Sequence, residues 1–131
     1  MQAQHDIEAL IQLVFDIGMT LHQDVGPGFI ESVYERVLAE RLQQCGIKVD
    51  RQQPVHVEIY GKRYEDAFRY DLLVNDILLV EIKSIEKLGP IHNKQVLTYI
   101  RLMNLRYGLL LNFGGEAFRQ GMRRIVNERH V

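Results

Sequence analysis

Two carboxylates and a lysine stand at the ends of apolar segments in the middle of the chain. Glu81 and Lys83 close the apolar run 77–80, and Asp71 lies in the apolar segment before it. Mg²⁺ prefers carboxylate oxygens and keeps several of its waters. Hydrolysis of a phosphodiester needs a positioned water and positive charge against the negative charge that develops on the phosphate. Asp71 and Glu81, with the carbonyl of Ile82, are therefore candidate metal ligands, beside which Lys83 could orient the water and stabilise the transition state.

A shared metal ion sets a condition on how the two apolar segments pair as a hairpin. A two-residue loop at Asn75-Asp76 would place Asp71 opposite Val80 and send the two carboxylates to opposite faces. An odd-length connection or a bulge would place Asp71 opposite Glu81. Apolar residues occupy both faces of this hairpin, so the pattern alone does not decide, and we predict the odd register.

A plainer interpretation is that Glu81 and Lys83 form a solvated strand end and that Asp71 is a surface salt-bridge partner. Glu31 favours the metal hypothesis, because at about 100° per residue it projects into the apolar arc of its helix. A carboxylate that faces a core is costly unless it is paired or bound to a metal. The alternative for Glu31 is that it caps free amides or interacts with the helix dipole in the first turn.

Other polar side chains have a functional and a structural interpretation. His22 falls within the apolar face of the first helix, where a buried, hydrogen-bonded core histidine is favoured. His92, Gln95 and Tyr99 recur one helical turn apart and could contact a phosphate or a base, although the polar edge of an amphipathic helix is the commoner meaning. Cys45 lies in an apolar helical stripe, as a packed thiol would.

The periodicity of the apolar residues predicts the elements that must position these groups. Apolar residues recur at helical spacing up to residue 44, alternate or form short runs from 55 to 83, and return to helical spacing at 92–103. Two of the expected strands are apolar at consecutive positions, so we expect both of their faces to be covered. The order helix, helix, three strands, helix, strand predicts a mixed α/β class with a central sheet. The expected helices are 6–22, 29–44 and 92–103, the expected strands are 55–59, 68–74, 77–83 and 107–112, and the tail holds a helical turn at 116–120 and an edge strand at 122–126.

Composition limits the classes of function. The chain has 131 residues, 47% of them hydrophobic, which suits one soluble domain spanning 1–131. No segment approaches the roughly 20 apolar residues of a membrane helix, and the single cysteine suits a reducing, cytoplasmic compartment. A net charge of −1 argues against nucleic-acid binding by charge alone. We also expect a possible homodimer, from the apolar first helix. Four C-terminal arginines could touch a phosphate backbone or form a solvated charged tail: Arg119, Arg123, Arg124 and Arg129.

The spacing of Gly28, Glu31 and Tyr34 resembles the signature of the GxxExxY family, which belongs to the PD-(D/E)XK nuclease superfamily. The resemblance runs from about His22 to Val126, and its motifs are specific when taken together. These motifs are His22 ahead of Gly26-Pro27-Gly28, then Arg69 to Val74, Val80 to Lys83, His92-x-x-Gln95-x-x-x-Tyr99 and Gly108 to Phe113.

The resemblance implies a restriction-endonuclease-like core, with a central mixed sheet flanked by helices. It also implies a Mg²⁺- or Mn²⁺-dependent nuclease that acts on DNA or RNA. Asp71, Glu81 and Lys83 match the core catalytic set, and Glu31 matches the first-helix acid, a further metal ligand. Gln95 and Tyr99 match an element of the exonuclease-like branch and, with His92, would position substrate. Some superfamily members only bind, so the alternative is a non-catalytic module that interacts with nucleic acid or protein and retains the scaffold.

Overall fold

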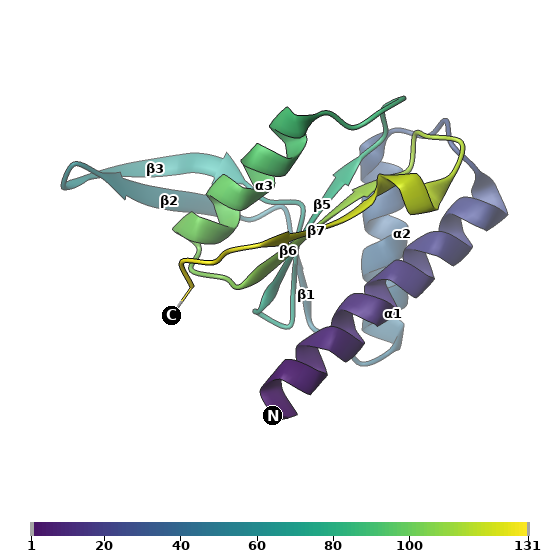
Figure 1. Ribbon diagram of the computed structural model, residues 1–131, viewed down its shortest axis with the longest axis horizontal. Helices are drawn as coiled ribbons and strands as arrows, with labels where there is room; N and C mark the ends of the chain where they lie inside the picture. Colours follow the sequence, from purple (N-terminus) through teal and green to yellow (C-terminus); the bar gives the residue numbers. More distant parts are fainter. Residues whose placement is uncertain (1, 131) are drawn as a thin grey trace.

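The computed structural model describes residues 2–130, with side chains from Asp6 onward, as a central sheet between helices (Figure 1). The mixed α/β class and the flanked central sheet agree with the prediction. The elements in chain order are α1 (Gln2–Val25), α2 (Glu31–Gln44), β1 (Val49–Arg51), β2 (Pro54–Ile59), β3 (Lys62–Arg69), β4 (Leu72–Val74), β5 (Leu78–Lys83), α3 (Pro90–Leu102), β6 (Tyr107–Asn112), the 3-10 turn η1 (Phe118–Gly121) and β7 (Met122–Val126).

Five strands form the main sheet in the order β1-β4-β5-β6-β7. β5 and β6 run parallel, and the other neighbouring pairs are antiparallel. A parallel pair needs a crossover connection, which α3 supplies. All six residues of β6 are buried, as expected for a central strand covered on both faces.

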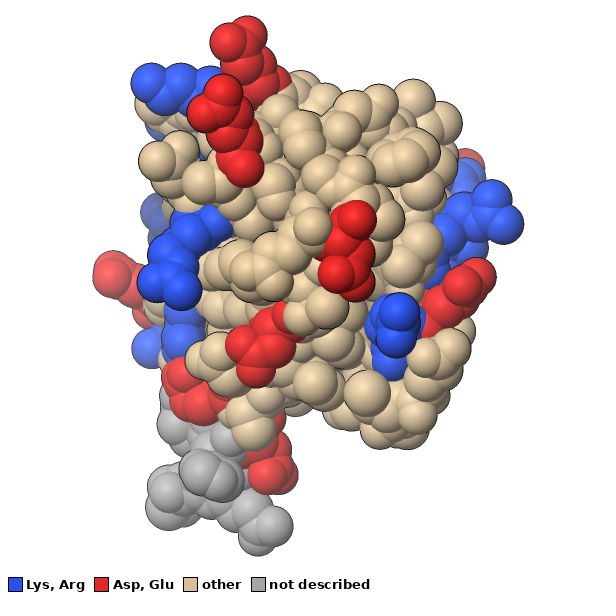
Figure 2. Space-filling view, turned by 90° about the vertical axis from the view of Figure 1, so that its right-hand side faces the viewer, with Lys and Arg blue, Asp and Glu red and all other residues tan. Residues whose placement is uncertain are grey.

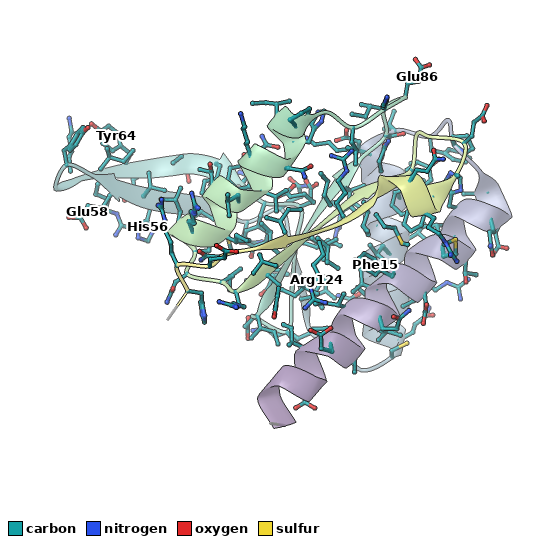
Figure 3. All side chains as sticks on the ribbon, viewed as in Figure 1. Phe15, His56, Glu58, Tyr64, Glu86 and Arg124 are labelled. Atoms are coloured by element: carbon teal, nitrogen blue, oxygen red, sulfur yellow. The ribbon has the colours of Figure 1, made fainter. Side chains whose placement is uncertain are left out.

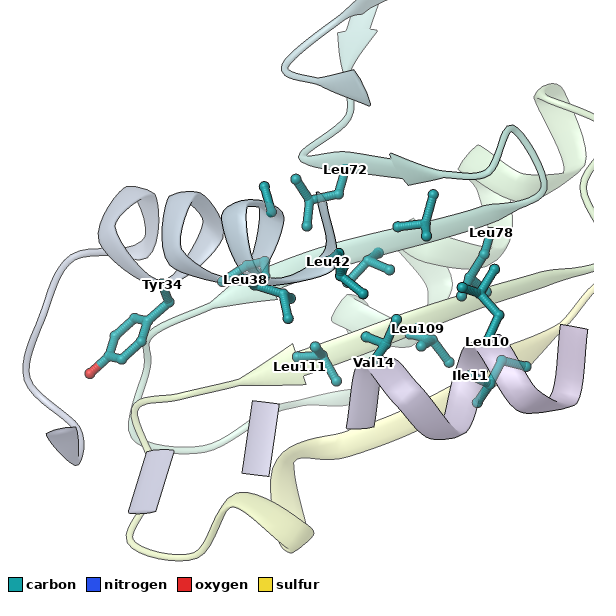
Figure 4. Packing of buried hydrophobic residues seen from close by; sticks show 14 of the residues in the cluster. Leu10, Ile11, Val14, Tyr34, Leu38, Leu42, Leu72, Leu78, Leu109 and Leu111 are labelled. Atoms are coloured by element: carbon teal, nitrogen blue, oxygen red, sulfur yellow. The ribbon is translucent and has the colours of Figure 1, made fainter. Parts of the chain in front are cut away.

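Helices cover both faces of this sheet. Alternation along the strands sends Leu78 and Val80 of β5 toward α1 and α2, and Leu79 toward α3. The side chains on the α1 and α2 face form a first core, and those on the α3 face form a second. Figure 4 shows the first core, in which side chains of the two helices pack against those of three central strands. Its labelled residues are Leu10, Ile11 and Val14 of α1, Tyr34, Leu38 and Leu42 of α2, and Leu72, Leu78, Leu109 and Leu111 of the sheet.

The expectation of three consecutive strands in one sheet is wrong in detail. The first strand of the main sheet is the short β1, which the sequence analysis did not predict. Residues 55–59 pair instead with β3 in a separate two-stranded sheet, which projects away from the main sheet in Figure 1. Seven of the eight β3 residues are exposed, so this hairpin lacks the apolar surface that would hold it over the core. The expected strand 68–74 is therefore divided between β3 and β4.

The prediction of an odd register in the next hairpin is confirmed. Val74 pairs with Leu78 and Leu72 pairs with Val80, so three residues connect β4 to β5. Asn75 and Asp76 in this connection have φ values of 51° and 61°, a left-handed conformation that Asn and Asp tolerate. One step beyond the last pair, Asp71 lies opposite Glu81.

Several boundaries and burials differ from the predictions. The strands expected at 107–112 and 122–126 are confirmed, and the expected helical turn is η1, at 118–121. The predicted packing of Cys45 is wrong, because the residue caps the end of α2 and is exposed. No helix of residues 2–130 is both long and apolar enough to span a bilayer.

Candidate active site

Asp71 and Glu81 meet where β4 and β5 begin to separate. The Oδ2 atom of Asp71 accepts a hydrogen bond of 2.7 Å from the main-chain amide of Ile82. This bond ties the Asp71 carboxylate to β5 beside Glu81. Glu81 alternates with Val80 and Ile82 of the first core, so it points to the face of the sheet that α3 covers. The hairpin thus brings both predicted carboxylates to one place.

Glu81 is a buried acid with an unsatisfied oxygen. Its side chain is 4% exposed, and among the described residues its Oε1 atom has no hydrogen-bond partner. Burial, followed by the nearby charge of Asp71, raises the pKa of Glu81 to about 10, and Lys83 opposes part of this rise. A buried carboxylate without a counter-charge is costly. The site therefore holds a position at which a cation would be strongly favoured.

Two residues of α3 face this pair of carboxylates. Burial raises the pKa of Tyr99, and the charge of Glu81 adds to the rise, while a hydrogen bond with Gln95 opposes it. The Tyr99 hydroxyl is therefore close enough to both acids to sense their charge, and Gln95 is its hydrogen-bond partner. The ring of Tyr99 also stacks on Phe68 of β3, with 3.9 Å between ring centroids and an angle of 4° between planes. This stack connects the projecting hairpin to the site.

Lys83 and Gln95 line an open cleft of about 450 Å³ beside the carboxylates. His92 lines the same cleft, and its Nδ1 atom accepts a hydrogen bond of 2.9 Å from the amide of Gly89. That bond satisfies one of the free amides at the start of α3. His92 therefore has a structural role at the start of α3.

Glu31 lies outside the core, so the expectation that it faces the apolar arc of its helix is wrong. Its side chain is exposed, and its Oε1 atom accepts a hydrogen bond of 3.3 Å from the amide of Ser84. The Ser84 hydroxyl donates in turn to the carbonyl of Phe29, at 2.6 Å. The projection misled because it gives the side of a helix on which a residue lies but not whether the core extends that far, and Glu31, as the first residue of α2, lies beyond the end of the packed core.

The signature residues around Glu31 shape the loop that precedes α2. The Tyr34 hydroxyl, at the end of a fully buried side chain, donates to the carbonyl of Gly26 at 2.6 Å and accepts from the amide of Phe29 at 3.3 Å. Gly28 has a φ of 120°, a conformation that favours glycine. Together these residues fix the start of α2, and thereby Glu31, beside the end of β5.

Sequence reasoning missed two polar residues next to Asp71. Glu35 is 3% exposed and forms an ion pair of 2.8 Å with Arg51. Gln52 donates hydrogen bonds to both Glu35 and Asp71. Both residues line a cleft of about 770 Å³ together with Glu31 and Asp71. A signal for Glu35 existed, because it stands three, four and seven residues before the buried Leu38, Ala39 and Leu42.

The donor set fits a hard divalent cation. Carboxylate oxygens are the ligands that Mg²⁺ and Mn²⁺ prefer, and Mg²⁺ is commonly held by one or two carboxylates plus water. Asp71 and Glu81 provide two carboxylates, one of them with an unpartnered buried oxygen. Among the side chains that the structure describes, residues 6–130, no three of His, Cys, Asp or Glu come close enough together to hold a metal ion. Glu31 therefore does not join Asp71 and Glu81 in one compact cluster.

The remaining predicted polar groups contribute to structure. His22 is buried, as predicted, and its Nε2 atom lies 2.9 Å from the carbonyl of Gly115. Arg124 of β7 pairs with Glu8 of α1 at 2.5 and 2.8 Å, and Figure 3 shows it beside that helix. Arg123 donates to Asn93 at 2.7 Å. Two of the four C-terminal arginines are thus engaged within the chain.

The net charge of −1 gives the chain no strong overall preference for a polyanion. On the face shown in Figure 2, acidic and basic side chains are interspersed over a largely uncharged surface. This agrees with the net charge of −1. A nucleic acid would have to be recognised locally, at the clefts, rather than through a broad basic field.

Comparison with known proteins agrees with this geometry. The family model of the PD-(D/E)XK nuclease superfamily matches residues 8–125, from within α1 to the penultimate residue of the edge strand β7. Searches of curated proteins and of solved structures gave no match.

Proposed function

This chain belongs to the PD-(D/E)XK nuclease superfamily, and we propose that it is an active, divalent-metal-dependent nuclease that hydrolyses phosphodiester bonds of DNA or RNA. One observation carries the proposal. By the register of the β4–β5 hairpin, Asp71, which directly precedes β4, lies opposite Glu81 of β5, and among the described residues Glu81 keeps a buried oxygen without a hydrogen-bond partner. A protein with a purely structural use for this position would do better with an apolar residue or a satisfied polar one.

Asp71 and Glu81 would hold the metal ion, with the carbonyl of Ile82 as a further oxygen. Glu31 would contribute an additional oxygen from the neighbouring cleft, which it lines together with Asp71 and Ile82. When bound, Mg²⁺ or Mn²⁺ supplies Lewis-acid polarisation of the phosphate and lowers the pKa of a coordinated water.

The other residues act on the substrate directly. The ammonium of Lys83 would orient the attacking water and stabilise the charge that develops on the phosphate. Gln95 and Tyr99 would hold the nucleic-acid strand by hydrogen bonds to phosphate or base, and His92 would assist from the same cleft as Lys83 and Gln95. The support for these roles is that Lys83 and Tyr99 interact electrostatically with Glu81, that Gln95 hydrogen-bonds to Tyr99, and that His92 lines the same cleft as Lys83 and Gln95.

Finer assignments belong to the same proposal. We assign the chain to the GxxExxY group, as one nuclease-like domain over 1–131; the support is the spacing of Gly28, Glu31 and Tyr34, of which Tyr34 fixes the loop before α2. The exposed thiol of Cys45 suits a cytoplasmic protein. A homodimer also stays a proposal. The apolar face of α1 is buried within its own chain, so exposed side chains such as Phe29 and Ile30 (49% and 71%) would have to form the interface.

The test is cleavage of labelled single- and double-stranded DNA and RNA in Mg²⁺ or Mn²⁺ by wild type, Asp71→Asn and Asp76→Asn. Asp76 is a matched control, because it is an exposed acid in the β4–β5 connection that pairs with Lys48. We expect the wild type and Asp76→Asn to cut at least one substrate and Asp71→Asn to cut none. Equal cutting by all three proteins would remove Asp71 from the mechanism. The absence of cutting and of metal binding in wild type would favour the non-catalytic interaction module.

A further inference from the structure

We propose that Gln52 is a positioning residue that holds the Asp71 carboxylate in the orientation needed to bind metal, and that Glu35 holds Gln52. This inference rests on the proposed function, because it concerns how the same metal site is built. None of the motifs in the sequence includes Gln52 or Glu35, and neither residue contacts Glu81 or Lys83 in the structure.

Gln52 contacts Asp71 twice. Its main-chain amide donates to the Asp71 carbonyl at 3.0 Å, and its side-chain Nε2 atom donates to the Asp71 Oδ1 atom at 3.1 Å. The other carboxylate oxygen, Oδ2, accepts from the amide of Ile82 at 2.7 Å. One donor on each oxygen prevents the carboxylate from rotating. An ionised carboxylate has about four lone-pair positions, so these two bonds leave others free for a cation.

Glu35 fixes the direction of the Gln52 amide. The Nε2 atom of Gln52 donates to the Oε1 atom of Glu35 as well as to Asp71. Ionised carboxylates only accept hydrogen bonds, so the amide nitrogen, not its oxygen, must face both acids. Glu35 is itself fixed, because it is buried in α2 and paired with Arg51. Glu35 of the rigid helix α2 thus fixes Gln52, and Gln52 fixes the Asp71 carboxylate. Asp71 lies outside any strand and needs such support.

The backbone conformation of Gln52 would suit a glycine better than a glutamine, which indicates that the side chain has a role other than folding. Its φ is 52°, in the left-handed region where glycine is more stable than a residue with a side chain. The bond from its main-chain amide to Asp71 would close the base of the hairpin whatever the side chain. A glycine would therefore satisfy the backbone, while only the side chain reaches the Asp71 carboxylate.

Gln52→Gly separates the two roles. It relieves the backbone conformation and keeps the main-chain bond, while it removes one hydrogen bond to the buried Glu35; because these effects oppose each other, we expect the melting temperature of the metal-free protein to stay close to that of wild type. Affinity for Mn²⁺, measured by calorimetry, should fall about 10-fold or more, as for other residues that orient a metal ligand. Gln53→Ala is the matched control, because Gln53 is an exposed neighbour whose side chain bonds only to the Arg51 carbonyl. It should bind Mn²⁺ as wild type does.

A second measurement needs no metal. Hydrogen exchange of the Ile82 amide reports whether Asp71 stays in place, because that amide donates to its carboxylate. In Gln52→Gly we expect this exchange to become about tenfold faster, the effect of losing one hydrogen bond, with the Val80 amide unchanged. Unchanged exchange at Ile82 would overturn the positioning role, even if wild type proved to have no nuclease activity. A lowered melting temperature with unchanged Mn²⁺ affinity would also overturn it, in favour of a structural role.

Discussion

Replacement of Glu81 by glutamine should make the metal-free protein more stable while it abolishes metal binding. Glu81 is 4% exposed, and no described residue forms a hydrogen bond with its Oε1 atom. Burial and the neighbouring Asp71 raise the pKa of Glu81 from 4.5 to about 10. The glutamine side chain has the same shape as the protonated acid and never ionises. Glu81→Gln therefore keeps the packing of the buried acid. It also removes the free-energy cost of keeping a proton on Glu81 in the folded protein that the unfolded chain would release.

The sign and size of the effect follow from proton linkage. Between pH 4.5 and about 10 the folded protein retains a proton that the unfolded chain releases, so the free energy of unfolding falls as pH rises through this window. Stability from this group is complete below pH 4.5 and is lost by pH 10. The slope approaches about 1.4 kcal/mol per pH unit, which gives about 3 kcal/mol at pH 7. For a chain of this size that is about 10 °C in melting temperature.

The assay is urea denaturation in EDTA at several pH values from 5 to 9. Wild type should lose stability steadily with rising pH, and Glu81→Gln should be more stable and nearly independent of pH. Glu35→Gln is the control for a buried acid that has a partner, and loss of its ion pair with Arg51 should lower stability. Wild-type stability without a pH slope, or a Glu81→Gln variant less stable than wild type, would refute the reasoning.

Three further predictions concern single positions. Tyr34→Phe removes the bonds to Gly26 and Phe29 and should lower the free energy of unfolding by about 1–2 kcal/mol; an unchanged urea midpoint would contradict this. Lys83→Met should lower kcat about 100-fold with little change in KM, and an effect on KM alone would mean that Lys83 only binds substrate. Gly108→Ala would bring a methyl group within 2.7 Å of a valine of α3 and should destabilise by about 1–3 kcal/mol, whereas equal or greater stability would show that α3 can move away.

The sequence was sufficient for the features that depend on local periodicity. Helical spacing and buried apolar runs identified the three main helices and the central strands. The pairing of Asp71 with Glu81 could be stated only as a condition, because both faces of that hairpin are apolar and the turn alone sets its register.

Features that depend on distant partners could not be predicted. Alternation at 55–59 indicated a strand but not its sheet, because its partner β3, which follows after a tight turn, is mostly exposed and carries no apolar pattern that would mark it as a strand. Gln52 gave no signal, since its importance comes from a left-handed backbone and two acids from other elements. Glu31 and Glu35 occupy the same side of one helix, and only the packing of α2 decides that Glu35 is buried and Glu31 exposed.

The central claim is that Asp71 and Glu81 together bind a catalytic divalent cation. The most direct measurement is an anomalous-difference map from crystals of the wild-type protein grown with Mn²⁺. The proposed site predicts one strong peak, with a carboxylate oxygen of Asp71 and of Glu81 each within about 2.5 Å of it. A map with no peak there, or with the Mn²⁺ held by other residues, would contradict the claim.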